Sequence, residues 1–149
     1  MTSLSGKNIM VLVANGVDET VMSSVQRDLL KQGASVKTVG LQTGLVSSWN
    51  VDTWGLYFPV DQQMSQTLGA DFDALVIPSG ARATQKLATT PHTERIISSF
   101  VLGKKPMLLM GDDAAGLLSK VGIVGAEFVS TLDAFIGQIG QVSDVKAAA

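Results

Sequence analysis

Three short apolar runs, each stopped by turn-forming residues, constrain this chain more than any other feature. The runs are rich in Val, Ile, Leu and Met, and each is too short for a typical helix, which favours strands buried on both faces. They span Asn8–Ala14, Phe72–Ile77 and Pro106–Met110, and the turn residues after them are Asn15-Gly16, Pro78-Ser79-Gly80 and Gly111-Asp112. Such strands are typical of a parallel sheet covered by helices.

Helical patterns separate the apolar runs. Asp18 is placed to cap a helix that continues to Gln32, and a strand over Ser35–Val39 completes a strand-helix-strand unit, whose crossover is almost always right-handed. The other expected helices span Arg82–Ala88, the stretch from Pro91 to Gly103, Ala114–Lys120 and Glu127–Ile139. Turn and aromatic residues near Val46 to Val60 favour a small antiparallel excursion. The predicted fold class is α/β: a flavodoxin-like three-layer sandwich with a mainly parallel sheet and a short antiparallel excursion.

Length and charge predict one domain over residues 1–149 and exclude several classes of partner. The chain has 149 residues, a net charge of −2 and no basic stretch longer than two residues. A phosphate backbone or an anionic membrane would need a larger positive footprint. No apolar run reaches the ~20 residues that a membrane helix needs, and the N-terminus lacks the pattern of a signal peptide. We therefore expect no nucleic-acid or membrane partner and a cytoplasmic location.

The cysteine and histidine counts limit the chemistry further. The chain has no cysteine and one histidine, His92. A disulfide, a thiolate zinc site, a cysteine nucleophile and a multi-histidine metal centre are therefore excluded. His92 lies in a polar stretch near a helix start, where a solvated surface histidine is expected. We expect neither a bound metal nor a cofactor.

The turns after the apolar runs form the predicted ligand crevice. In an open parallel sheet, ligands bind outside the carboxyl ends of the strands, so these turns should converge. The last turn leads directly into a helix, whose positive end favours a small anionic ligand or an activated nucleophile. The predicted crevice residues are Asn15, Gly16, Glu19, Ser79, Gly80, Gly111 and Asp112.

The order of these segments, from Lys7 to about Gly122, resembles the DJ-1/PfpI family and class I glutamine-amidotransferase-like domains. The most specific match is Ala74–Gly80, which is similar to the family's Asp-Ala-hydrophobic-Pro-Gly-Gly segment with Ser79 at the first glycine. A closer resemblance is to the C-terminal flavodoxin-like domain of large-subunit catalases, which has a similar Gly-Asp elbow. Haem chemistry in those catalases belongs to a separate, larger domain. The resemblance therefore implies a packing or oligomer-supporting module, either free-standing or cut from a larger chain.

The same resemblance points to two residues that thiol-using members need and this chain lacks. Where those members carry the cysteine nucleophile at the elbow, this chain has Gly111. Where they carry a glutamate near the start of the first helix, ungapped register places Val21. The role does not pass to Asp18 or Glu19, because neighbouring positions on a helix point in directions ~100° apart per residue. The resemblance implies that thiol catalysis has been lost.

Three functional hypotheses follow. The leading one is a non-catalytic module that self-associates as a homodimer or higher homo-oligomer, in a structural, oligomer-supporting or chaperone-like role. A competing one is a small-molecule hydrolase or lyase that uses Asp112, with Glu19 as its partner, although an aspartate at a helix start is also an ordinary cap. A third is a regulator that binds a ligand in the crevice without turnover.

An aromatic cluster could supply edge packing, a pocket or a subunit interface, and its members are Trp49, Trp54, Tyr57 and Phe58.

Overall fold

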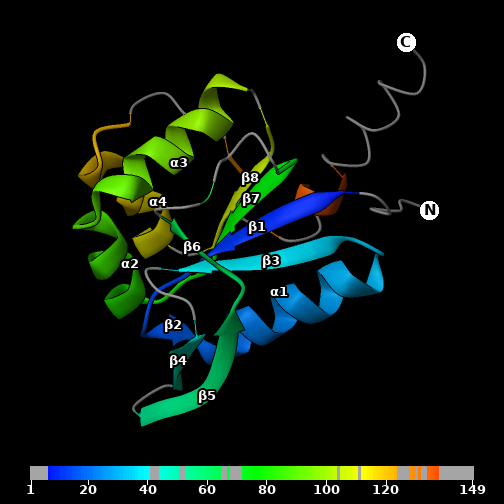
Figure 1. Cartoon of the computed structure of the whole chain (residues 1–149), viewed down its shortest axis with the longest axis vertical. Coiled ribbons are helices and arrows are strands. Elements are labelled where there is room, and N and C mark those ends of the chain that lie inside the picture. Colours follow the sequence, from blue (N-terminus) through cyan, green and yellow to red (C-terminus); the bar gives the residue numbers. More distant parts are fainter. Residues whose placement is uncertain are drawn as a thin grey trace.

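A five-stranded parallel sheet forms the centre of the protein (Figure 1). The computed structural model describes residues 7–40, 44–50, 53–64, 67, 72–103, 105–110, 112–123, 128–129, 131 and 134–137. The strand order is β6-β3-β1-β7-β8, and every neighbouring pair runs parallel. The strands are β1 (Asn8–Leu12), β3 (Ser35–Gly40), β6 (Gln62–Gln63), β7 (Ala74–Ile77) and β8 (Met107–Leu109).

Helices cover both faces of this sheet because the chain crosses it in two directions. The helices are α1 (Glu19–Lys31), α2 (Ala81–Ala88), α3 (Pro91–Leu102) and α4 (Asp112–Lys120). The path from β1 to β3 runs one way across the sheet, and the path from β7 to β8 runs the other way. Right-handed crossovers then place α1 on one face and α2 and α3 on the opposite face, as Figure 1 shows. No helix among the described residues is long and apolar enough to span a membrane.

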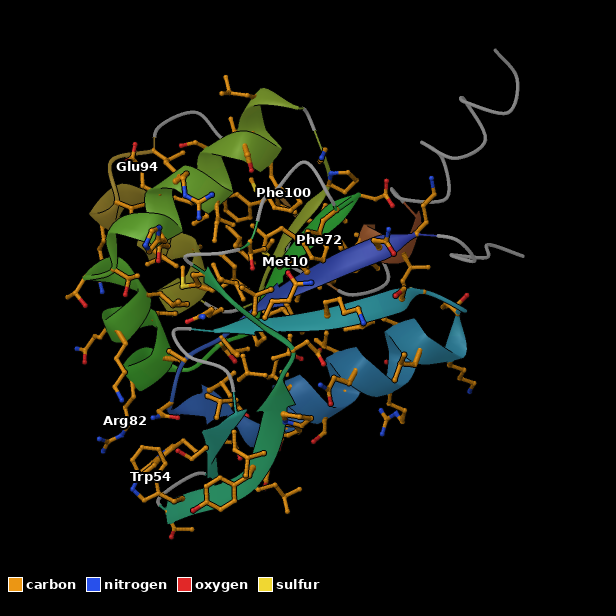
Figure 2. The ribbon with its side chains drawn as sticks, in the orientation of Figure 1. Met10, Trp54, Phe72, Arg82, Glu94 and Phe100 are labelled. Carbon is orange, nitrogen blue, oxygen red and sulfur yellow. The ribbon has the colours of Figure 1, made fainter. Side chains whose placement is uncertain are left out.

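The core explains why the first apolar run has no polar alternation. β1 is the central strand, and Ile9–Leu12 are fully buried on both of its faces. The inward side of α1 contributes Met22, Val25 and Leu29 to the same core. Phe72, which precedes β7, and Phe100, on α3, belong to the same core, and Figure 2 shows them near Met10. Burial on both faces leaves no solvent side that would select polar residues.

A second, smaller sheet carries the antiparallel excursion. It consists of β2 (Val17–Asp18), β4 (Gly44–Asn50) and β5 (Thr53–Val60) in the order β2-β4-β5. β4 and β5 form an antiparallel hairpin, and β2 pairs in parallel with β4. Val46, Phe58 and Val60 bury one side of the hairpin in the core. Figure 1 shows the far part of β5 projecting from the body of the protein.

The predicted fold class is confirmed, and apart from the last helix the predicted element ends lie within two residues of the observed ones. The helix predicted over Glu127–Ile139 is wrong at its start. Val129 instead forms a parallel bridge with Leu108, and its amide donates to the carbonyl of Met107 at 2.9 Å. This bridge satisfies backbone groups on the outer edge of β8, which a helix at Val129 would leave without partners. Of the later described residues, 134–137 are helical.

Candidate functional site

The turn after β1 and the turn after β7 lie directly against each other. Gly16 and Gly80 have φ angles of 99° and 144°, which residues with a side chain rarely adopt. A Cβ on Gly80 would lie 2.7 Å from the carbonyl oxygen of Gly16, so the two backbones need the missing side chain to come this close. The amide of Asp18 donates to the carbonyl of Ser79 at 2.8 Å and joins the turns. The structure thus brings the first two predicted crevice turns together.

The hairpin holds the first of these turns through polar contacts. The side-chain oxygen of Asn15 accepts hydrogen bonds from the amide of Ser47 at 3.0 Å and from its hydroxyl at 3.3 Å. The amide of Gly16 donates to the carbonyl of Ser47 at 2.8 Å. These polar groups of Asn15 and Gly16 therefore position β4 over the end of β1.

Glu19 anchors the other strand of the hairpin. Tyr57 pairs with Ser47 and Trp54 pairs with Trp49, so β5 has one more residue than β4 between these pairs, which is a β-bulge. The bulge is at Gly55 and Leu56. The amide of Leu56 donates to the carboxylate of Glu19 at 2.7 Å, and the carbonyl of Leu56 accepts from the hydroxyl of Ser48 at 2.7 Å.

Gly55 makes room for this carboxylate. A Cβ on Gly55 would lie 2.5 Å from Oε1 of Glu19. Any side chain at this position would push the carboxylate away from the amide of Leu56. The half-buried Glu19 therefore acts here as a partner for an irregular strand.

The remaining predicted crevice residues fall at the elbow. β8 lies beside β7, and the amide of Met110 donates to the carbonyl of Ile77 at 3.1 Å, so the two strands end at the same edge of the sheet. α4 begins at Asp112. Gly111 and the side chain of Asp112 lie outside the described residues, so their place in the crevice stays a prediction. Asp18, in contrast, is the N-cap of α1, with its side chain accepting from the amides of Thr20 and Val21.

A group that the sequence analysis missed lies where the hairpin meets α2. The guanidinium carbon of Arg82 is 4.2 Å from the ring centre of Trp49 and 5.8 Å from that of Trp54. The two indole rings meet edge to face at 5.1 Å. Figure 2 shows Arg82 and Trp54 side by side at this end of the molecule. The spacing of Arg82, Gln85, Lys86 and Thr89 was the available signal, because residues at i, i+3, i+4 and i+7 share one helix face.

The aromatic cluster therefore divides between several environments. Phe58 is buried in the core, Trp49 is half-buried, and Trp54 and Tyr57 are largely exposed.

His92 is half-buried in the first turn of α3. In the part of the chain that the structure describes, no three His, Asp or Glu side chains gather closely enough to hold a metal ion.

The family of the chain follows from comparison with known proteins. The model of the DJ-1/PfpI family matches residues 7–145. The chain belongs to the DJ-1/PfpI family. Catalase HPII of Pseudomonas putida is 30% identical over 135 residues, which cover 89% of this chain and 18% of the catalase. The predicted resemblance to the family and to catalases is thereby confirmed, and this DJ-1/PfpI chain spans only 18% of the length of that relative.

Solved structures of other proteins have the same fold. The VC2308 protein superimposes with a TM-score of 0.71 at 23% identity, over 85% of this chain and 64% of that one. A two-domain protein from Anabaena variabilis, with DJ-1/ThiJ/PfpI-like and ferritin-like domains, gives a TM-score of 0.69 at 19% identity, over 90% of this chain and 38% of that one. Identities this low show the shared architecture and leave the chemistry to the residues of each chain.

The contact between the two glycine turns can be tested by adding one methyl group. Gly80→Ala should destabilise the protein by about 2 to 4 kcal/mol, because it combines an unfavourable φ with overlap against the backbone of Gly16. Gly122→Ala is the matched control, since Gly122 has a φ of 82° and open space where the methyl would be. It should cost only about 1 kcal/mol from the backbone alone. Urea unfolding would measure both, and equal costs would contradict the close contact.

The anchoring role of Glu19 can be tested with a double-mutant cycle. Glu19→Ala should cost about 1 kcal/mol of stability, because the bulged amide of Leu56 loses its acceptor. Gly55→Ala should displace the same carboxylate, so the double variant should cost clearly less than the sum of the single ones. Glu19→Gln keeps an acceptor oxygen and should recover most of the loss. Additive costs in urea unfolding would show that the two residues act independently.

Proposed function

We propose that this protein is a non-catalytic DJ-1/PfpI module that associates with a second copy of itself through the β4–β5 hairpin. The exposed apolar side of the hairpin carries the proposal. Leu45 lies opposite Pro59, and Ser47 lies opposite Tyr57. Side chains alternate along a strand, so these four residues share the side that faces away from the buried Val46 and Phe58. Three of them, Leu45, Tyr57 and Pro59, are here named the hairpin patch.

The hairpin patch gathers exposed apolar side chains next to one another. Leu45 and Tyr57 are each 67% exposed, and Pro59 is exposed between them on the same side. Leu56 and Trp54 add further exposed apolar surface towards the end of the hairpin. Contiguous exposed apolar side chains in a folded protein favour a contact with a partner.

A second copy of this chain fits the chemistry of the hairpin patch. The described hairpin residues, 44–50 and 53–60, include no Lys, Arg, Asp or Glu. Interface centres are depleted of charge and enriched in aromatic residues, as this surface is. A twofold dimer brings the same patch of both subunits together, and a neutral patch does so without repulsion between like charges. β5 is also the edge strand of its sheet, so among the described residues no further strand pairs with its outer edge.

Several residues near the predicted crevice support the non-catalytic part of the proposal. The chain has no cysteine, and Val21 occupies the position where thiol-using relatives are expected to carry glutamate. The nearby carboxylate of Glu19 accepts a hydrogen bond from the hairpin, and Asn15 holds the opposite strand. These polar groups stabilise the hairpin, which agrees with a structural, oligomer-supporting or chaperone-like role.

Self-association can be tested by placing a charge in the hairpin patch. The wild-type protein should sediment as a dimer or a higher oligomer at tens of micromolar. Tyr57→Arg should shift it towards monomer by at least tenfold in dissociation constant, because two buried guanidinium groups would meet across the twofold axis. Leu102→Arg, at an 85% exposed position on α3, is the control and should leave association unchanged. A monomeric wild type, or equal behaviour of both variants, would contradict the proposal.

The absence of turnover can be tested with the substrates expected of the competing hypothesis. Wild type and Asp112→Asn would be assayed with amides, esters, glyoxals and peroxides, and neither should accelerate any reaction above the rate with a thermally unfolded sample. Turnover by the wild type that the substitution abolishes would instead establish the hydrolase or lyase hypothesis. Turnover that survives the substitution would also overturn the non-catalytic role and would place the chemistry elsewhere.

A further inference from the structure

An open pocket of about 310 Å³ lies between the outer face of α2 and the end of the hairpin. Four of its lining residues, Arg82, Gln85, Lys86 and Thr89, follow one helix face, and Trp54 faces them from β5. The opposite face of α2 buries Ala83 and Leu87 in the core. One face of α2 therefore packs against the core. The other face presents two cationic and two neutral polar side chains to the pocket.

Arg82 is held in place before any ligand arrives. Its Cβ lies where a side chain on Gly16 would be, and its guanidinium lies over the ring of Trp49. A guanidinium stacked on a ring keeps its N–H donors free at its edge, where they can bind two oxygens of one anion. Among the described residues, Arg82 has no carboxylate partner and no hydrogen-bond acceptor. A fixed donor loses little conformational freedom on binding, which favours affinity.

The charge of Arg82 is placed where helix stability alone does not favour it, whereas Lys86 lies in the last turn, where the helix dipole favours a cation. Arg82 lies in the first turn, where positive charge opposes the helix dipole, and this turn has no acidic residue. Lys86 follows at i+4, where like charges repel each other. In the described part of the protein Lys86 also has no ion-pair partner, although the chain as a whole carries a net charge of −2. A bound anion would relieve both unfavourable interactions.

The geometry points to a small ligand that joins an oxyanion, either phosphate or carboxylate, to a flat ring. Arg82 and Lys86 bind the oxyanion, and the 51% exposed ring of Trp54 stacks on the ring of the ligand. Gln85 and Thr89 offer hydrogen bonds to the remainder of the ligand. The volume is at the small end of the range for metabolite pockets, so one compact molecule fills it.

The two tryptophans of the chain report on this pocket without any label. Both lie against Arg82, so tryptophan fluorescence, excited selectively over that of Tyr57, comes from this place alone. The probes are adenosine monophosphate, which has a ring and a phosphate, and naphthoate, which has a ring and a carboxylate. Adenosine supplies the ring without the charge, and inorganic phosphate supplies the charge without the ring. Titration of the full chain should give saturable quenching that is tighter for one of the first two probes than for adenosine or inorganic phosphate, and that probe is then used with the variants.

Three variants separate the pocket from general surface charge. Arg82→Gln should weaken binding of the better probe about tenfold or more, because a charge-assisted bidentate contact is lost. Lys86→Gln should weaken it about threefold, and this exposed side chain can be changed without disturbing the hairpin. Lys37→Gln removes the same charge from an exposed position on β3 and should have no effect. Tyr57→Arg keeps all five lining residues and should still bind, so this result does not depend on self-association.

Defined outcomes would overturn the assignment. Absence of saturable quenching by any probe at millimolar concentration would exclude the ligand class. Unchanged affinity in both Arg82→Gln and Lys86→Gln would show that binding occurs elsewhere. Equal affinity for adenosine and its monophosphate would remove the role of the cations, and equal affinity for phosphate and the monophosphate would remove the role of Trp54.

Discussion

The backbone of Gly16 lies against the backbone of Gly80, and the end of the molecule that holds the predicted crevice turns is built around this contact. The two glycines end the turns after β1 and β7, which are neighbouring parallel strands. Parallel strands bring their carboxyl ends to one edge of a sheet, so the turns must share limited space there. The absence of two side chains lets them do so. It also leaves room for the start of the Arg82 side chain to pack against Gly16.

The hairpin depends on the same turn. Asn15 and Gly16 bind Ser47 on β4, and Glu19, at the start of α1, binds the bulged amide of Leu56 on β5. Contacts at the end of β1 thus fix both strands of the hairpin. The bulge bends β5 away from a regular ladder, and the anchored base leaves the outward apolar side exposed. Asn15, Gly16 and Glu19, which the sequence predicted to line a ligand crevice, here position the hairpin.

The chain keeps the architecture of its family and contains no cysteine. The DJ-1/PfpI match extends over residues 7–145, and the low identities to solved relatives reflect a shared architecture. The elements are retained while the thiol is absent, because packing of the sheet and helices does not require the nucleophile. The cations of α2 sit on the solvent side of a helix whose other face is buried, where they can vary without altering the core.

The amino-acid sequence by itself determined the parallel sheet, its helices and the antiparallel excursion, because the periodicity of buried residues is a local property. It also determined that no cysteine chemistry is available. The sequence did not predict the short strands β2 and β6 or the bridge at Val129, because each has too few residues for a recognisable pattern. They form because neighbouring strand edges have backbone groups that need hydrogen-bond partners. Only the tertiary structure decided the use of Glu19 and Arg82. Each acts on a hairpin more than 25 residues away in the chain, and no local pattern encodes which distant backbone amide or ring a side chain will meet.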